Sequence, residues 1–182
     1  MKKGIILLMF FVTSYAWGQF NAITASTPKR RGYDHKFGVG LNYTWPSPGV
    51  SCRIGFNDKF KSQVSLAYRN YGVYAWSLIG LELNYIFGDS KLGFGDIEGF
   101  GYAGIGRGTI SWKDPLYQSL GMENYHWTGY NVGVGAELFP DAFKNKVGII
   151  GKIGFGSYGA YGVETVLATG LLYGGAIHYY IK

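Results

Sequence analysis

The chain has 182 residues, including 30 glycines, 16 tyrosines and 12 phenylalanines, and its formal net charge is +6. Glycine lies well over twice its usual share of about 7%, but the chain has no three-residue period and many apolar residues, which excludes collagen-like and disordered proteins. The positive charge is scattered over short turns and the run at 29–31, which excludes a nucleic-acid-binding surface.

The first 18 residues have the pattern of a secretory signal peptide. Lys2 and Lys3 precede an apolar run at 5–12, which is too short to cross a bilayer as a helix, and the cleavage site is expected before Gln19. The mature chain of 164 residues (182 minus 18) suits one domain and has no second long apolar run, which excludes an α-helical membrane protein. The basic stretch 19–35 is expected to be a flexible periplasmic tail or a short docking segment.

From residue 36 to the end, apolar residues alternate with small or polar ones, as in strands that have one apolar face. In the last strand, for example, Leu171 and Ile177 fall on one face and His178 falls on the other. Eight strands are expected, at 36–44, 49–56, 62–70, 77–87, 96–109, 128–139, 146–157 and 165–181. The sequence therefore predicts an all-β protein, an eight-stranded antiparallel up-and-down transmembrane β-barrel at 36–182. Glycines in step with the alternation would let a small barrel bend and leave room for neighbouring rings.

The fifth strand, 96–109, has no clear facing. Phe100 and Tyr102 share a face with Asp96 and Glu98, while isoleucines lie on the other face. A β-bulge in this strand, or a position of the two carboxylates at the membrane rim, would account for the conflict.

The less apolar strand faces carry several charges. In a membrane barrel this face lines the interior, whereas in a soluble barrel it faces water. The signal peptide favours the membrane arrangement, in which four of these residues form a charged network inside the barrel: Arg53, Glu82, Glu137 and Lys152.

Aromatic residues gather at opposite strand ends, as they do in the two interfacial belts of membrane barrels. The connections expected on the outer side have tryptophans in or beside them: Trp45, Trp76, Trp112 and Trp127. The other connections, expected at 57–59, 88–91 and 140–146, are short and charged. Phenylalanines flank these: Phe56, Phe60, Phe87, Phe94, Phe139 and Phe143. The alternative interpretation is that these rings cap a soluble core.

The connection 110–127 is unusually long, and long loops are often functional. Seven of its residues are candidates for contact with a partner protein or with lipopolysaccharide: Trp112, Leu116, Tyr117, Leu120, Met122, Tyr125 and Trp127. The alternative is that they lie on the barrel rim as part of the aromatic belt.

No catalytic, metal or cofactor site is predicted. The G-x-G-x-x-G run at 99–104 is not followed by a helical period, so it does not indicate a dinucleotide site. His35, His126 and His178 lack metal-ligand spacing. The single cysteine, Cys52, lies on an apolar strand face and is interpreted as a small hydrophobic residue.

The signal peptide, the glycine-rich and aromatic strands and the closing segment 171–181 together resemble the small outer-membrane barrels of the OmpA/OmpX-like type, in the form common in the Bacteroidota. The resemblance covers the mature chain, although such barrels usually end on an aromatic residue and this chain ends Tyr-Tyr-Ile-Lys. It implies a non-enzymatic outer-membrane protein without a cofactor, in contact with lipid and lipopolysaccharide.

The role expected for such a barrel is structural or interactive: it would bind another envelope component or act as a subunit of a larger assembly. Two alternatives remain open. One is an outer-membrane lipid-modifying enzyme with His126 as base, near Glu123 and with Ser111 and Ser119 at a distance. The other is a secreted, lipocalin-like barrel that binds a small apolar ligand.

Overall fold

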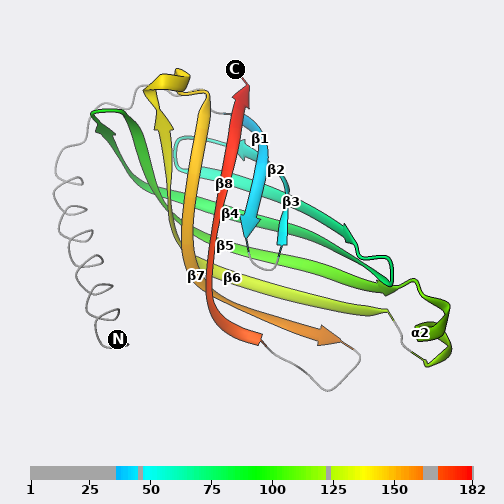
Figure 1. Ribbon diagram of the computed structural model, residues 1–182. Coiled ribbons are helices and arrows are strands. Elements are labelled where there is room, and N and C mark those ends of the chain that lie inside the picture. The colour runs from blue at the N-terminus through cyan, green and yellow to red at the C-terminus, as the bar shows by residue number, and fades with distance from the viewer. Residues whose placement is uncertain (1–35, 45–46, 122–123, 162–167, 182) are drawn as a thin grey trace, which may run out of the picture.

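The computed structural model describes residues 36–44, 47–121, 124–161 and 168–181. The expected signal peptide, 1–18, and the expected tail, 19–35, lie outside these ranges. The described residues form a closed barrel of eight antiparallel strands in sequence order, with the first strand paired to the last (Figure 1). The strands are β1 (Phe37–Thr44), β2 (Ser47–Gly55), β3 (Phe60–Asn70), β4 (Tyr74–Leu92), β5 (Gly95–Trp112), β6 (Tyr125–Pro140), β7 (Val147–Tyr161) and β8 (Ala168–Ile181). The predicted eight-stranded up-and-down barrel is confirmed.

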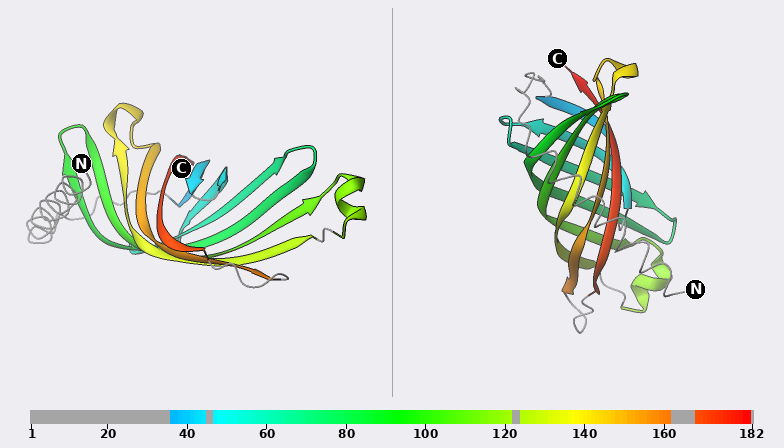
Figure 2. Two further views of the ribbon diagram at one scale, coloured as in Figure 1. Left: turned by 60° about the horizontal axis from the view of Figure 1, so that its bottom comes forward. Right: turned by 90° about the vertical axis from the view of Figure 1, so that its left-hand side faces the viewer.

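Different elements lie at the two ends of the barrel. At one end, which we call the terminal end, β1 begins and β8 finishes, and the turn after β6 forms a 3-10 helix, η1 (Asp141–Phe143). At the opposite end, which we call the loop end, the helix α2 (Pro115–Ser119) joins the long strands β5 and β6 and extends beyond the short β1–β2 hairpin (Figures 1 and 2). Among the described residues, no helix has the length and apolar character needed to cross a membrane.

One predicted connection is wrong. Residues 88–91 belong to β4, where Asp89 pairs with Glu98 of β5, and the turn falls at 93–94 instead. A β-bulge between Ile86 and Gly88 shifts the register and lets both strands continue. The charged residues that indicated a turn therefore lie on strand ends near the solvent.

The apolar faces of the strands point outward. They include Leu41, whose exposed fraction is 70%, and residues such as Leu81 and Val132, which also lie open on the barrel surface. Polar residues such as Gln63 and Asn84 are buried on the inner faces. This polar-inside, apolar-outside arrangement is the reverse of a soluble barrel. We call the outward apolar side chains the outer belt.

The side chains of β5 alternate without interruption between the inner and outer faces. Phe100 and Tyr102 are buried on the inner face, and Glu98 shares that face with them. Ile105 lies on the outer belt. β5 has no bulge of its own, and the conflict is resolved because Glu98 takes an inward position on the same face as Phe100 and Tyr102.

Two aromatic residues expected in the belts lie inside the barrel. Trp127 stacks on Trp76, with ring centroids 6.4 Å apart, and keeps only 8% exposure. Phe139 keeps 2% exposure and packs against Tyr180. The belt prediction is wrong for these two residues, because both fall on inner-face positions of β6.

Glycines on the inner face make room for these rings. A Cβ atom at Gly108 would lie 2.1 Å from the ring of Trp127, and one at Gly135 would lie 2.6 Å from the ring of Phe100. Such separations are shorter than van der Waals contact, so a side chain at either position would displace the ring. The high glycine content is thus tied to the packing of large side chains within a narrow barrel.

We predict that Gly135→Ala lowers the free energy of unfolding by about 1–3 kcal/mol, the usual cost of overpacking. The added methyl group would meet both the Phe100 ring and, at 2.8 Å, the carbonyl oxygen of Gly151. The matched control is Gly80→Ala on the inner face of β4, where the nearest atom to a new Cβ lies at 3.9 Å. Urea unfolding in detergent micelles measures both, and equal stabilities for the two variants would contradict the packing account.

Candidate functional sites inside and at the end of the barrel

The carboxylate of Glu137 on β6 is fully buried and has no solvent exposure. Its Oε2 atom lies 3.3 Å from Arg53 Nη2 and accepts a hydrogen bond of 3.2 Å from Lys61 Nζ. The hydroxyl of Tyr180 donates to its other oxygen. Two cations and a phenol therefore compensate one buried charge, as a carboxylate in such a place requires.

Glu98 completes this group. Glu98 and Glu137 are directly opposite each other in the β5–β6 ladder, a position in which two carboxylates repel. The ammonium of Lys61, which reaches in from β3, bonds to both. Lys61 thus links β3 to β5 and β6 across the barrel. We call Arg53, Lys61, Glu98, Glu137 and Tyr180 the inner cluster.

Aromatic rings surround the cations of the inner cluster. The guanidinium carbon of Arg53 lies 5.0 Å from the centroid of the Phe100 ring, and Lys61 Nζ lies 5.2 Å from that of Phe139. Cation–π attraction in this desolvated setting adds to the ion pairs. It also explains why Phe139 is placed inside rather than in the belt.

A second ion pair lies farther from the terminal end. Lys152 Nζ on β7 donates to both carboxylate oxygens of Glu82 on β4, at 2.8 and 3.0 Å. The ammonium also lies 5.4 Å from the Tyr102 ring centroid. The structure thus brings the four residues of the predicted network together as two pairs, Arg53 with Glu137 and Glu82 with Lys152.

The sequence pattern did not identify Lys61, Glu98 and Tyr180 as network members. Lys61 lies just outside the expected third strand, and Glu98 lies in the strand whose facing was uncertain. Tyr180 falls on the inner face of β8, so the alternation indicated its facing but not its hydrogen bond to Glu137. His178, on the same face, is fully buried, and its Nε2 lies 2.8 Å from Ser51 Oγ.

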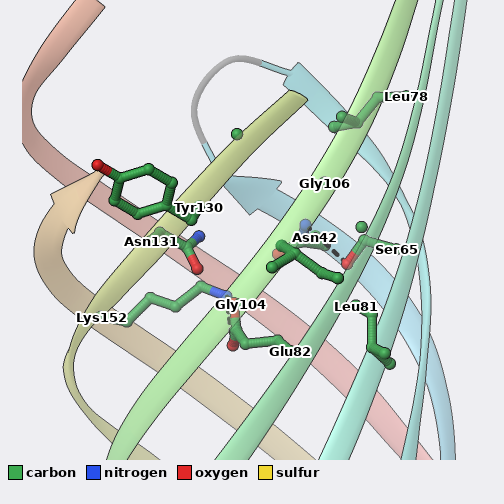
Figure 3. Close-up of a pocket in the computed structure, with 13 residues that line it drawn as sticks. Asn42, Ser65, Leu78, Leu81, Glu82, Gly104, Gly106, Tyr130, Asn131 and Lys152 are labelled. Carbon is green, nitrogen blue, oxygen red and sulfur yellow. Dashed lines mark hydrogen bonds and ion pairs between the residues drawn. The ribbon is translucent and has the colours of Figure 1, made fainter. Parts of the chain in front are cut away.

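A small cavity lies beside the second ion pair. A cavity of about 60 Å³ adjoins the Glu82–Lys152 pair, and Asn42, Ser65 and Asn131 also line it (Figure 3). That volume holds a few water molecules. An eight-stranded barrel is just wide enough for side chains to fill it, and here buried charges and rings such as Arg53, Phe100 and Tyr180 occupy its interior.

The loop end carries a ladder of aromatic rings in contact. Tyr71 packs on Tyr74 at 4.9 Å between ring centroids, Tyr74 on Trp112 at 5.5 Å, and Trp112 on Tyr117 at 5.2 Å. The ladder ties the β3–β4 turn to helix α2. The carboxylate of Asp114 caps α2 by accepting the backbone N–H of Leu116 at 2.8 Å.

The side chains of Leu116 and Leu120 lie exposed beside this ladder, with exposed fractions of 63% and 68%. Helix α2 has five residues, and none of them has a buried side chain. Contact with the ring ladder therefore holds the helix in place. We call Leu116, Leu120 and the ring ladder the outer tip. An exposed apolar group of this kind indicates a contact surface.

The candidate contact residues have different positions. Trp112 and Tyr117 belong to the ring ladder, Leu116 and Leu120 are exposed, and Tyr125 is half-buried. Trp127 is wrong as a contact residue because it lies inside the barrel mouth against Trp76. Met122 lies outside the described residues.

The alternative catalytic residue, His126, is exposed on β6, and its Nδ1 atom lies 3.1 Å from Thr109 Oγ1. Ser119 donates its hydroxyl to the carbonyl of Leu116, and Glu123 lies outside the described residues. Within the described ranges, no group of three or more His, Cys, Asp or Glu side chains is arranged to hold a metal ion.

No family model matches the chain, and no curated protein matches it. Among solved structures, the chain is similar to the crystal structure of the N-terminal β-barrel domain of Pseudomonas aeruginosa OprF. The two share 17% sequence identity with a TM-score of 0.51, and the match covers 80% of this chain and 94% of that domain. At this identity the likeness shows the fold.

We predict that Glu137→Leu lowers the free energy of unfolding by about 3–5 kcal/mol, because it leaves Arg53 and Lys61 buried with too little negative charge. The double variant Arg53→Met/Glu137→Leu is expected to lose less than the single variant, since it removes one of those cations together with the anion. Urea unfolding in micelles gives both values.

The control is Glu98→Gln. Its side chain is partly exposed, and Lys61 keeps Glu137 as a partner, so the expected loss is smaller. A double variant less stable than Glu137→Leu alone would show that the charges do not compensate each other.

Proposed function

We propose that this protein is a non-enzymatic outer-membrane barrel whose outer tip binds another protein of the cell envelope, as a subunit of a larger outer-membrane assembly. One observation carries the proposal: the barrel interior is filled by paired charges and rings, while the outer tip exposes apolar residues. The polar interior offers no wide solute channel, and the tip remains as the surface for interaction.

The outer belt supports the membrane location. Large apolar side chains such as Leu41, Tyr130 and Leu171 are more than half exposed all around the barrel. A belt of this extent is unfavourable in water and is stabilised by contact with lipid chains. The expected signal peptide and the fold likeness to the OprF barrel domain agree with this location.

A location in the outer membrane also implies which end of the barrel faces the cell exterior. With the terminal end of the barrel on the periplasmic side, the outer tip faces the cell exterior and lies in contact with lipopolysaccharide. We further propose that the chain is an OmpA/OmpX-like barrel of the kind found in the Bacteroidota. A secreted, soluble, lipocalin-like barrel is disfavoured by the polar interior, which offers little apolar surface to a small ligand.

We predict that the double variant Leu116→Ser/Leu120→Ser loses its partner. Tagged protein extracted from envelopes in mild detergent should retain a stoichiometric envelope protein, and the variant should retain it at least about tenfold less, the loss expected when two apolar contacts of about 1 kcal/mol each are removed. The matched control is Phe94→Ser/Phe143→Ser, two similarly exposed residues in turns of the terminal end. Mass spectrometry of the eluates provides the measurement.

Two results would contradict this part of the proposal. A wild-type protein that purifies alone would show that the tip holds no stable partner. Equal loss of the partner in both double variants would place the contact elsewhere or show a general defect.

We predict that His126→Ala leaves the lipids of the outer membrane unchanged. His126 is engaged with Thr109 on an exposed strand surface, and a catalytic base needs an oriented acid and a nucleophile within reach. Lipid mass spectrometry of cells expressing each form provides the comparison. A modified lipid that disappears in the variant would instead establish the enzyme alternative.

A further inference from the structure

The strand β8 has one edge that is only partly covered. The β1–β8 ladder stops at Thr44 and Gly174, whereas β8 continues along β7 as far as Ala168 (Figure 1). Within the described residues, the part of β8 from Ala168 to Tyr173 therefore pairs with β7 alone. We call the side of 168–173 that faces away from β7 the free edge.

The pairing of β8 shows which backbone groups lie on the free edge. The N–H of Tyr180 donates to the carbonyl oxygen of Lys146, just before β7, and the β7–β8 register then continues without a shift to the start of β8. In an antiparallel ladder, every second residue directs its N–H and C=O groups to the same neighbouring strand. Even-numbered residues of β8 therefore bond to β7. The odd-numbered residues direct these groups to the free edge: Thr169, Leu171 and Tyr173.

The free edge lies at the level of the outer belt. Leu171 forms one row across the barrel wall with Phe155 of β7 and Val132 of β6, and all three side chains are more than half exposed. Lipid chains offer no hydrogen bonds, and each backbone group left unpaired among them costs several kcal/mol, so an open strand edge is not stable there. The free edge therefore needs a partner that donates and accepts hydrogen bonds in a row.

The free edge also lacks the features that usually keep a strand edge unpaired. Proteins protect such edges with proline, lysine or a bulge. The residues 168–173 include neither proline nor lysine, and their ladder with β7 has no bulge. By contrast, β2, whose ladder with β3 begins only at Val50, carries Pro48 before that point. The edge of β8 is thus open to an added strand.

Two copies of this chain cannot pair through their free edges. Copies that face each other across a two-fold axis along the membrane normal run their β8 strands in the same direction across the membrane, which prevents antiparallel pairing. Barrel strands are tilted by about 35–45°, so two such strands cross at the contact and cannot pair in parallel. A strand antiparallel to β8 must run from the terminal end toward the loop end, as β1 does.

We propose that the free edge binds an extended segment of a second envelope polypeptide, which adds a strand antiparallel to β8. The edge, 168–173, spans about 20 Å at about 3.3 Å per residue, so the added segment is roughly six residues long. Every second residue of the segment is apolar and faces lipid beside Leu171 and Tyr173. The inference rests on the proposed membrane location, and it adds a lateral binding site to the one proposed at the outer tip.

The first measurement checks the free edge in the isolated protein. The full mature chain is folded in detergent micelles, and through-space contacts of its backbone protons are recorded by solution NMR. The N–H groups of Gly170 and Leu172 should show contacts to β7, whereas those of Leu171 and Tyr173 should show none to any other strand. Contacts from Leu171 or Tyr173 to another segment of the same chain would show that the chain covers its own edge, and would overturn the proposal.

The second measurement looks for the added strand in intact envelopes. Tyr173 is replaced by the photo-crosslinking amino acid p-benzoylphenylalanine, and the matched control carries it at Tyr130. The two tyrosines are 65% and 63% exposed on the outer belt, but Tyr130 lies on β6, which is paired on both sides there. Illumination should give a polypeptide adduct from position 173, with the crosslink within one short segment by mass spectrometry, and only lipid adducts from position 130.

Two changes at Leu171 separate backbone pairing from side-chain contact. Leu171→Pro removes the N–H that faces the free edge and leaves the β7 ladder intact, so the barrel should still fold. It should lower the yield of the adduct from position 173 at least about tenfold, through the loss of one hydrogen bond and the clash of the proline ring. Leu171→Ala keeps the N–H and should retain most of the adduct.

The outcomes separate this proposal from the proposed function. Lipid adducts alone at position 173, an adduct with a second copy of this chain, or equal yields in Leu171→Pro and Leu171→Ala overturn the added strand and leave the proposal for the outer tip standing. A chain that is absent from the outer-membrane fraction overturns the membrane location, and the added strand with it.

Discussion

A carboxylate without solvent exposure, that of Glu137, is held between the cations of Arg53 and Lys61 and the hydroxyl of Tyr180. An isolated charge in such a place would cost many kcal/mol, so its partners must arrive from other strands in fixed positions. They come from β2, β3 and β8, none of which pairs with β6. The charge of Glu137 is therefore compensated only when the barrel is closed.

The need to compensate the buried charge of Glu137 also determines how the interior is packed. Long charged side chains and rings fill a space that eight strands can just enclose, and glycines face the largest of them. Gly135 lies against Phe100, which in turn covers Arg53. The interior is thus specified by pairs in which a large side chain lies against a glycine. The surface available for binding a partner is therefore the outer one.

Two-residue alternation is a local property, and it was enough to predict the number of strands and the facing of most of them. It carries no information about register, which decides that Glu98 lies opposite Glu137 and needs Lys61. The position of Trp127 depended on Gly108 across the ladder, which local patterns do not show. The turn at 88–91 was misplaced because a bulge and charged strand ends resemble a turn in sequence.

The central claim is that the outer belt faces lipid and the inner faces do not. Solution NMR of the barrel in lipid nanodiscs tests this directly, through contacts between lipid acyl chains and side-chain methyl groups. The account predicts such contacts for Leu81 and Val132 on the outer belt and none for Ile86 and Leu172, which are buried on the inner faces. Acyl-chain contacts at Ile86 and Leu172, with Leu81 and Val132 in water, would contradict it.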